Sequence, residues 1–185
     1  MAQKDMGFSK GRSDERAARR MARLIALAGL PGTGKSTIAR ELARRTGAIW
    51  LRVDTMDQAI WASGTAPADL RDWTYRAAQA VAEDNLRLGR DVIGDCVNDW
   101  TIARDGWQAA GLRAGAEVLW VEIVCTDLVE HRRRVETRAS EVPGLVLPSW
   151  EEVIGRDYHR WDRDHLTIDT AGRGVAECVE IVLAK

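Results

Sequence analysis

Residues 29–37 read Gly-Leu-Pro-Gly-Thr-Gly-Lys-Ser-Thr and match the pattern GxxxxGK[ST], which binds the phosphates of a nucleotide. The segment lies between an apolar run and a helical pattern, as such a loop must. Glycine lets backbone N–H groups approach phosphate oxygens, and the helix N-terminus that follows adds partial positive charge. We expect Lys35 to reach the β- and γ-phosphates and Ser36 to bind Mg²⁺. The expected nucleotide-binding residues are Gly29, Pro31, Gly32, Thr33, Gly34, Lys35, Ser36 and Thr37.

Two aspartates, Asp54 and Asp95, end predicted strands. The carboxyl ends of parallel strands meet at one edge of a sheet, where ligands bind. Phosphoryl transfer needs a group that orients the attacking hydroxyl and accepts its proton, and we assign this role to Asp54, with Asp57 as the alternative base. Asp95 is expected to bind Mg²⁺, directly or through water. A turn or cap role is the structural alternative for either strand-end aspartate.

Further residues near the same rim are candidates for holding an acceptor molecule. Asn98 offers hydrogen bonds, Trp100 a stacking surface and Arg104 a positive charge, and Asp57 is the fourth candidate. These four residues are our expected substrate contacts.

A pair of arginines follows the fourth predicted strand. Arg134 and Arg138 are four residues apart, so a helix would present both guanidinium groups on one face, a geometry that suits a triphosphate. Glu130 and Glu136 are interleaved with them, so an ordinary salt-bridged surface helix is the alternative.

Short apolar runs rich in β-branched residues alternate with segments of helical period, which indicates a parallel sheet covered by helices on both faces. The sequence therefore predicts one three-layer α/β domain from residue 21 to residue 185, preceded by a flexible extension, residues 1–20. The expected strands cover residues 23–28, 48–53, 91–94, 118–125 and 166–168.

A long helix is expected between the second and third strands. Asp69 opens it, with Asp72 in its first turn, and Gly89 ends it. The stripe expected to face the core consists of Leu70, Trp73, Ala77, Val81 and Leu88.

The α/β pattern is interrupted at residues 140–165, where prolines and glycine break the chain and Ser149 with Glu152 caps a short helix. We expect this insert to form a lid. The tryptophans in loops or in the insert, which could stack on a sugar or ring or could instead pack in the interior, are Trp61, Trp150 and Trp161.

Composition narrows the class of partner. The formal net charge of −1 favours neither nucleic acid nor an anionic membrane surface, so a small molecule is the expected partner. The three cysteines are odd in number and lie in apolar surroundings, as buried thiols of a cytoplasmic protein do. The three histidines lack metal-ligand spacing, so we expect no zinc, and no apolar run approaches the roughly 20 residues of a membrane span. A monomer or a homodimer is expected.

The phosphate-binding loop, Asp54, residues 95–98 and the pair Arg134 and Arg138 follow one another in the order found in the AAA_33-type P-loop kinases, which the chain resembles from about Leu24 to its C-terminus. Gluconate kinase, chloramphenicol phosphotransferase and zeta-toxin-like enzymes belong to this group. The resemblance implies a five-stranded parallel sheet in the order 2-3-1-4-5, ATP with Mg²⁺, and a lid that closes over the donor. The arginine often found three residues after the equivalent of Asp54 is Asp57 here, so the resemblance does not identify the acceptor.

Three functions remain open from the sequence. A kinase that transfers the γ-phosphoryl group of ATP to a hydroxyl of a sugar, nucleoside or antibiotic-like molecule is the leading interpretation. A nucleic-acid end kinase would need a basic groove, against which the near-neutral charge counts. A nucleotide-dependent switch or NTPase would have no small-molecule acceptor.

Overall fold

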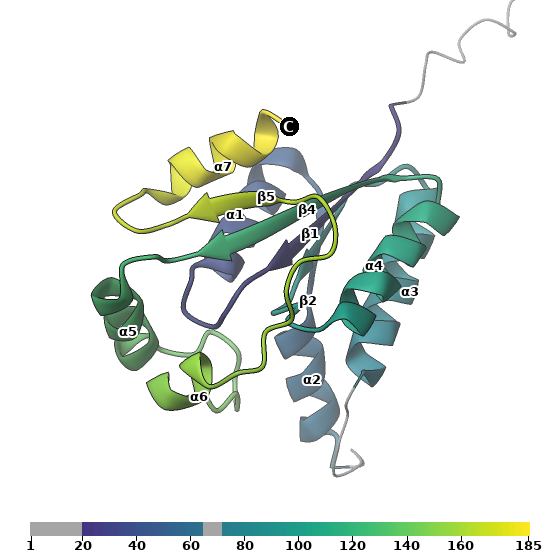
Figure 1. The fold of residues 1–185 in the computed structure, drawn as a ribbon. Helices are drawn as coiled ribbons and strands as arrows, with labels where there is room; N and C mark the ends of the chain where they lie inside the picture. The colour runs from purple at the N-terminus through teal and green to yellow at the C-terminus, as the bar shows by residue number, and fades with distance from the viewer. Residues whose placement is uncertain (1–19, 65–71) are drawn as a thin grey trace, which may run out of the picture.

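A computed structural model describes residues 20–64 and 72–185 of the chain (Figure 1). Its strands form one parallel sheet, as the pattern of elements predicted, in the order β2-β3-β1-β4-β5 that the resemblance implied. The predicted extension lies almost entirely outside the described residues. The strands are β1 Arg23–Ala28, β2 Ile49–Arg52, β3 Val92–Asp95, β4 Glu117–Val124 and β5 Leu166–Asp169.

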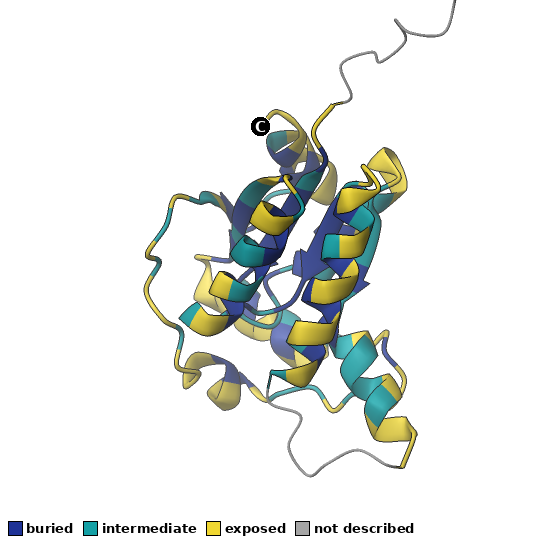
Figure 2. Ribbon diagram, turned by 90° about the vertical axis from the view of Figure 1, so that its right-hand side faces the viewer, coloured by how far each residue is buried: buried dark blue, intermediate teal, exposed yellow. Residues whose placement is uncertain are grey.

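Helices cover both faces of the sheet and make a three-layer sandwich (Figure 1). Helices α1 (Lys35–Thr46) and α7 (Val175–Leu183) pack on one face, and α3 (Trp73–Arg87) and α4 (Thr101–Arg113) pack on the other. The buried residues concentrate in the sheet and on the helix sides that face it (Figure 2). This is the layered arrangement that an alternating α/β sequence requires.

The strand β1 supplies apolar side chains to both halves of the core. Leu24 and Ala26 join the cluster under α3 and α4, whereas Ile25 and Leu27 join the cluster under α1 and α7. Such two-sided burial explains why the strand reads as a continuous apolar run. Pairing of Leu27 with Asp95 brings the end of β3 beside the start of the phosphate-binding loop.

The chain turns directly from strand β2 into a helix that the sequence did not predict. β2 ends at Arg52, and α2 runs from Val53 to Ala62. The expected strand to residue 53 was therefore too long, and Asp54 lies in the first turn of α2 instead of at a strand end. Asp54 still lies at the carboxyl edge of the sheet, because the helix begins there.

The predicted inward face of the long helix was wrong. α3 begins at Trp73, and its Trp73, Val81 and Leu88 side chains are exposed; the predicted positions Asp69 and Leu70 lie outside the described residues. Small side chains, with Leu86, allow α3 to lie close to the sheet and to α4, so the larger apolar residues are left outside. The buried residues of the helix are Thr74, Ala78, Gln79, Ala82 and Leu86.

The helices α2, α5 (Leu128–Thr137) and α6 (Trp150–Ile154) stand around the carboxyl edge of the sheet (Figure 1). The predicted cap of α6 is confirmed, because Ser149 and Glu152 form a reciprocal capping box. The three cysteines are buried, as expected. Among residues 20–64 and 72–185, the helices are too short or too polar to cross a membrane.

Two of the tryptophans considered for stacking are packed against the protein itself. Trp150 lies in a small buried cluster with Val135 and Val153. Trp161 donates a hydrogen bond from Nε1 to Glu122 at 2.7 Å and packs edge-on against Trp120. Their environment supports the packing alternative.

Candidate functional site

Glycine is required at two positions of the phosphate-binding loop. Gly29 has φ 130°, and a Cβ atom there would lie 2.1 Å from the carbonyl oxygen of Ile123. Gly32 has φ 86°, and its Cβ would lie 2.5 Å from the side chain of Val135. Both conformations are ones that other residues rarely adopt. The loop is therefore held in a fixed shape between β4 and α5.

Lys35 is buried at the start of α1, and its Nζ donates a hydrogen bond to the Leu30 carbonyl oxygen at 2.9 Å. Burial lowers the pKa of Lys35 to about 8, although the negative charges of Asp95 and Asp54 act in the opposite direction. No carboxylate among the described residues forms a salt bridge with Nζ. The ammonium group thus remains available for an anion that enters the loop.

Thr170, just after β5, ties the loop to the rest of the domain. Its Oγ1 lies 2.9 Å from the Thr33 carbonyl oxygen, and Arg134 donates hydrogen bonds to both Oγ1 and the carbonyl oxygen of Thr170. Arg134 also forms a salt bridge with Glu130 at 2.6 Å. The loop, α5 and the end of β5 are therefore joined by one polar network.

Asp95 lies at the bottom of the site and is almost fully buried. It accepts a hydrogen bond from Trp50 Nε1 at 3.1 Å and interacts with the Ser36 hydroxyl. Burial raises the pKa of Asp95, while nearby Lys35 favours its charged form. A hydroxyl and a carboxylate side by side are oxygen ligands of the kind that Mg²⁺ prefers, so Ser36 and Asp95 fit the metal role predicted for them.

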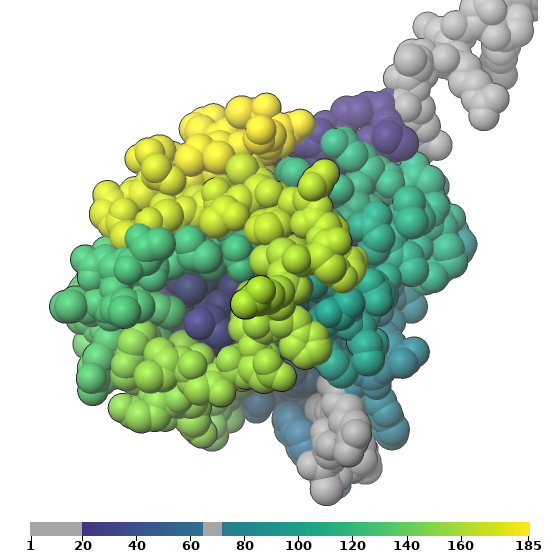
Figure 3. All heavy atoms as spheres, in the orientation of Figure 1, coloured from purple at the N-terminus to yellow at the C-terminus, as the bar shows by residue number. Residues whose placement is uncertain are grey.

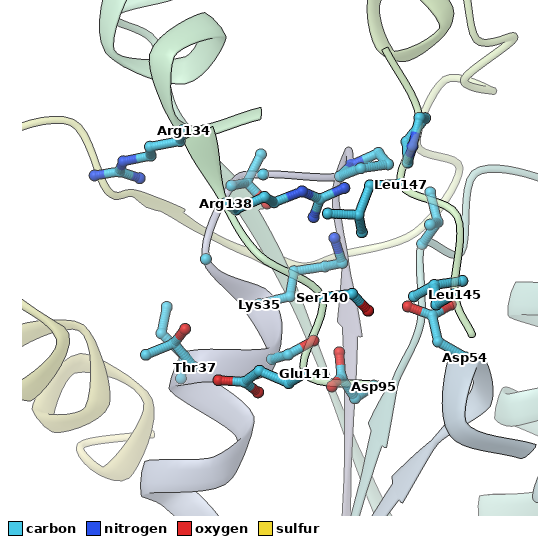
Figure 4. A pocket seen from close by; sticks show the side chains of 18 of the residues that line it. Lys35, Thr37, Asp54, Asp95, Arg134, Arg138, Ser140, Glu141, Leu145 and Leu147 are labelled. Atoms are coloured by element: carbon cyan, nitrogen blue, oxygen red, sulfur yellow. The ribbon is translucent and has the colours of Figure 1, made fainter. Parts of the chain in front are cut away.

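Asp54 and Arg138 face the same pocket from opposite sides (Figure 4). The described residues offer no hydrogen-bond partner to the Asp54 carboxylate or to the buried Nε of Arg138. Burial lowers the pKa of Arg138, and the charge of Asp54 opposes that shift. A half-buried guanidinium without a bonded partner costs free energy unless a ligand supplies one.

The two predicted arginines do not share a helical face. Helix α5 ends at Thr137, and Arg138 takes an extended conformation with φ −67° and ψ 141°. Figure 4 shows the guanidinium of Arg138 above Lys35, whereas the Arg134 side chain points away from it. The i, i+4 geometry expected from the sequence was wrong because the helix stops one residue early. Both side chains nevertheless line the pocket.

The four expected acceptor contacts lie outside the lining of this pocket. Asn98 is buried with φ 50° and donates a hydrogen bond to the Leu27 carbonyl oxygen at 2.7 Å. Trp100 packs edge-on against Tyr75. Asp57 is half-buried on α2, where burial raises its pKa.

Arg104, the fourth of these residues, is fully buried and is not placed to contact a ligand of the pocket. Its guanidinium donates hydrogen bonds to the carbonyl oxygens of Asn98, His159 and Arg160 and lies 4.2 Å from the ring of Trp161. The segment that precedes β5 is thereby fixed to α4.

Five charged residues that line the pocket were not among the predicted site residues, namely Arg52, Glu141, Glu152, Arg156 and Arg173. Arg52 and Glu141 both line it, and they form a salt bridge at 3.5 Å; Glu141 also pairs with Arg40 at 2.7 Å. Arg52 is the last residue of β2, two residues before Asp54. Its position at the carboxyl end of a strand was a sequence signal that it could line the site. Glu141 lies in the insert and carries no sequence signal of its own.

The pocket has a volume of about 700 Å³, within the usual range for small-molecule sites. Figure 3 shows it as a hollow with early residues of the chain at its floor, framed by α5 and the later segments. The phosphate-binding loop forms one wall, and residues 139–148, called here the covering segment, form another. Thr170, Arg173, Val175 and Cys178 line one end of it.

The family model of the AAA domain AAA_33 matches residues 24–154, well over half of the chain. Solved structures share its fold at low sequence identity. The APS kinase CysC of Mycobacterium tuberculosis, in complex with AMPPNP and APS, has a TM-score of 0.66 and 20% identity over 89% of this chain and 96% of that one. A gluconokinase of Sinorhizobium meliloti 1021 has a TM-score of 0.58 and 20% identity over 90% and 92%.

A third similar structure, Kti12 of Chaetomium thermophilum with ADP-AlF3, has a TM-score of 0.63 and 20% identity over 87% of this chain and 97% of that one. The similarity to these solved structures shows a shared fold. The family match rests on the sequence of residues 24–154, which include the phosphate-binding loop. The chain belongs to the AAA_33 family, with the fold of the P-loop kinases.

Proposed function

We propose that this protein transfers the γ-phosphoryl group of ATP to a hydroxyl group of a small molecule. The observation that carries the proposal is the meeting of Lys35, Asp54, Asp95 and Arg138 around one pocket at the carboxyl edge of the sheet. Each has a distinct task in phosphoryl transfer, and a carboxylate beside a phosphate site can orient an acceptor hydroxyl and accept its proton.

The donor end of the reaction depends on the phosphate-binding loop. Its backbone N–H groups and Lys35 hold the β- and γ-phosphates, and the dipole of α1 adds to their field. Ser36 and Asp95 are the residues that would hold Mg²⁺, which neutralises charge on the phosphates when bound. Thr170 and Arg134 keep the loop in place and do not themselves need to touch the transferred group.

The acceptor end depends on Asp54 and Arg138. Asp54 orients the acceptor hydroxyl and accepts its proton as the oxygen attacks the γ-phosphorus, while the bond from phosphorus to the leaving ADP oxygen breaks. Arg138 donates hydrogen bonds to the phosphoryl oxygens, where charge is carried in the transition state. The covering segment lines the pocket, and its closure over the γ-phosphate would exclude water and favour transfer over hydrolysis.

A nucleotide-dependent protein without a small-molecule acceptor is the second candidate. One similar structure, Kti12 with ADP-AlF3, is not named as a kinase, yet its TM-score of 0.63 is close to that of the APS kinase. In this case, the same loop would bind ATP, and hydrolysis would only change the position of the covering segment.

The decisive experiment follows the label from γ-labelled ATP with Mg²⁺ and pooled acceptors: sugars, nucleosides, antibiotics and RNA ends. Transfer to one small molecule supports the kinase, whereas release as free phosphate alone supports the second candidate. Asp54→Asn is the matched variant. It should lower transfer by about a hundredfold or more while ATP affinity changes little, because the base acts on the acceptor. If ATP binding is lost instead, Asp54 belongs to the nucleotide site.

A further inference from the structure

His131 lies on the side of α5 that faces the phosphate-binding loop. Its side chain is buried, and its Nε2 lies 2.9 Å from the carbonyl oxygen of Pro31. A carbonyl oxygen can only accept a hydrogen bond, so Nε2 carries the proton and donates it. Neither the predicted site nor the proposed function assigns a task to this histidine.

The carbonyl group that His131 binds belongs to the peptide between Pro31 and Gly32. Among the described residues no peptide bond is cis, and in a planar trans peptide the C=O and the following N–H point in opposite directions. The bond to His131 therefore turns the Gly32 N–H away from the histidine. No backbone carbonyl group in the described part of the chain accepts a hydrogen bond from that N–H, and Gly32 lines the pocket. One donor of the loop is thus left for a ligand.

The His131 ring is held in place by helix α6. Trp150 packs edge-on against it, with the ring centroids 5.2 Å apart and the planes at 88°. Trp150 belongs to the buried cluster with Val135 and Val153, and Leu30 of the loop packs against the same cluster. The loop, α5 and α6 therefore pack together at the position where the His131 bond is made.

The loop also lies too close to α5 for a side chain between them. A Cβ atom on Gly32 would be 3.4 Å from Cδ2 of His131 and 2.5 Å from the side chain of Val135. Glycine at position 32 thus allows the peptide to approach the imidazole closely enough for a direct bond. A peptide that is already oriented needs no rearrangement when an anion arrives, and pre-orientation of this kind raises affinity.

We infer that His131 is a positioning residue of the phosphate-binding loop: its Nε2–H fixes the peptide between Pro31 and Gly32 so that the Gly32 N–H faces the nucleotide phosphates. The inference rests on the nucleotide-binding part of the proposed function and adds a residue to it. Backbone N–H groups that face a common concavity are what an anion site requires.

Side-chain amides provide a matched test. The amide nitrogen of glutamine lies the same number of bonds from Cα as Nε2 of histidine, whereas that of asparagine corresponds to Nδ1. His131→Gln can therefore donate to Pro31, and His131→Asn cannot reach it. AMPPNP with Mg²⁺ is titrated calorimetrically into the full chain. The glutamine variant should bind it like the unchanged chain, and His131→Asn and His131→Leu should bind it about fivefold more weakly.

A second control separates positioning from stability. Val153→Ala removes buried packing beside Trp150, outside the pocket lining, and leaves the His131 bond in place. Urea unfolding should show a lower stability in this variant, while its affinity for AMPPNP stays unchanged. Equal affinities of the glutamine and asparagine variants, or an equal loss of affinity in Val153→Ala and His131→Asn, would overturn the inference. The glutamine and asparagine variants decide the question even if His131→Leu does not fold.

Transfer of γ-label is measured separately, so that the two proposals can fail independently. If the unchanged chain binds AMPPNP and transfers label but all variants bind equally, the role of His131 fails and the kinase proposal stands. If the affinities follow the expected pattern and label appears only as free phosphate, the kinase proposal fails while the role of His131 stands. Absence of AMPPNP binding to the unchanged chain would overturn both.

Discussion

Trp50 donates a hydrogen bond from Nε1 to Oδ2 of Asp95 at 3.1 Å, across the paired strands β2 and β3. The indole thus fixes the carboxylate that we assign to Mg²⁺, although Trp50 was not among the predicted site residues. Arg52, on the same strand, lies 4.0 Å from the same carboxylate oxygen. Strand β2 therefore orients the metal side of the site as well as carrying the chain to Asp54.

Trp50→Phe should weaken catalysis by removing this bond while keeping most of the packing. A hydrogen bond to a charged group contributes about 1.5–3 kcal/mol, so we expect an increase of about tenfold or more in the Mg²⁺ concentration needed for half-maximal transfer. Trp120→Phe is the matched control, since its Nε1 donates a bond of 2.8 Å to Gln108, whose side chain is outside the pocket lining. Equal Mg²⁺ dependence in the two variants would contradict the role of Trp50.

Lys35→Met should abolish ATP-dependent transfer and preserve the fold. The lysine is buried with its charge directed to the loop, and the methionine keeps its length while removing the charge. Loss of a charged contact to the phosphates should reduce kcat/KM by about a hundredfold or more. Circular dichroism and denaturant unfolding check the fold, and full activity in this variant would refute the assignment of the loop.

Arg138→Ala and Arg134→Ala should fail in different ways. Arg138 has no bonded partner among the described residues, so its loss should lower kcat by about a hundredfold with little effect on the free energy of unfolding. Arg134 joins Glu130 and Thr170, so its loss should lower the free energy of unfolding by about 1–3 kcal/mol. Kinetics and urea unfolding of both variants decide the matter, and the reverse pattern would exchange the two roles.

Asp57→Asn should leave transfer intact and slightly stabilise the protein at pH 7. Burial, together with the charge of Asp54, raises the pKa of Asp57 above its usual value. The folded state then binds the proton more tightly than the unfolded state, so the stability is greatest below the unfolded pKa and falls as the pH rises through the folded one.

Removing this half-buried charge should therefore gain a few tenths of a kcal/mol at pH 7, an effect reduced by solvent screening. The gain should shrink as the pH is lowered toward 4, which urea unfolding at both pH values measures. Loss of transfer in Asp57→Asn would instead make Asp57 the base.

The sequence predicted the parallel sheet and the phosphate-binding loop because these depend on local patterns, whereas the strand order was implied by the resemblance to the family. The apolar run of β1, the glycines that follow and the start of α1 lie next to one another in the chain. The face of α3 could not be predicted in this way. Hydrophobic periodicity assigns the largest apolar residues to the core, but close packing against α4 selected Ala78 and Ala82 and exposed Trp73.

The sequence analysis expected a lid at residues 140–165, but it did not predict which of these residues line the pocket. Leu145 and Leu147 belong to a segment without regular structure, and Glu141 of the same segment pairs with Arg40 and Arg52, which are distant in the sequence. In the sequence alone, Glu141, Arg40 and Arg52 look like ordinary charged surface residues. Arg104 shows the opposite case. It was predicted to contact the substrate because of its charge, but its guanidinium donates hydrogen bonds to three backbone carbonyl oxygens instead.

The contact between Thr170 and the Thr33 carbonyl oxygen joins residues that are far apart in the order of synthesis. A nascent chain emerges with its nucleotide-binding sequence first, but the strand that leads to Thr170 is the last of the sheet. The fully braced loop can therefore form only after β5 has left the ribosome and paired with β4. The brace on the loop is in this sense completed late in synthesis, after the loop itself has been made.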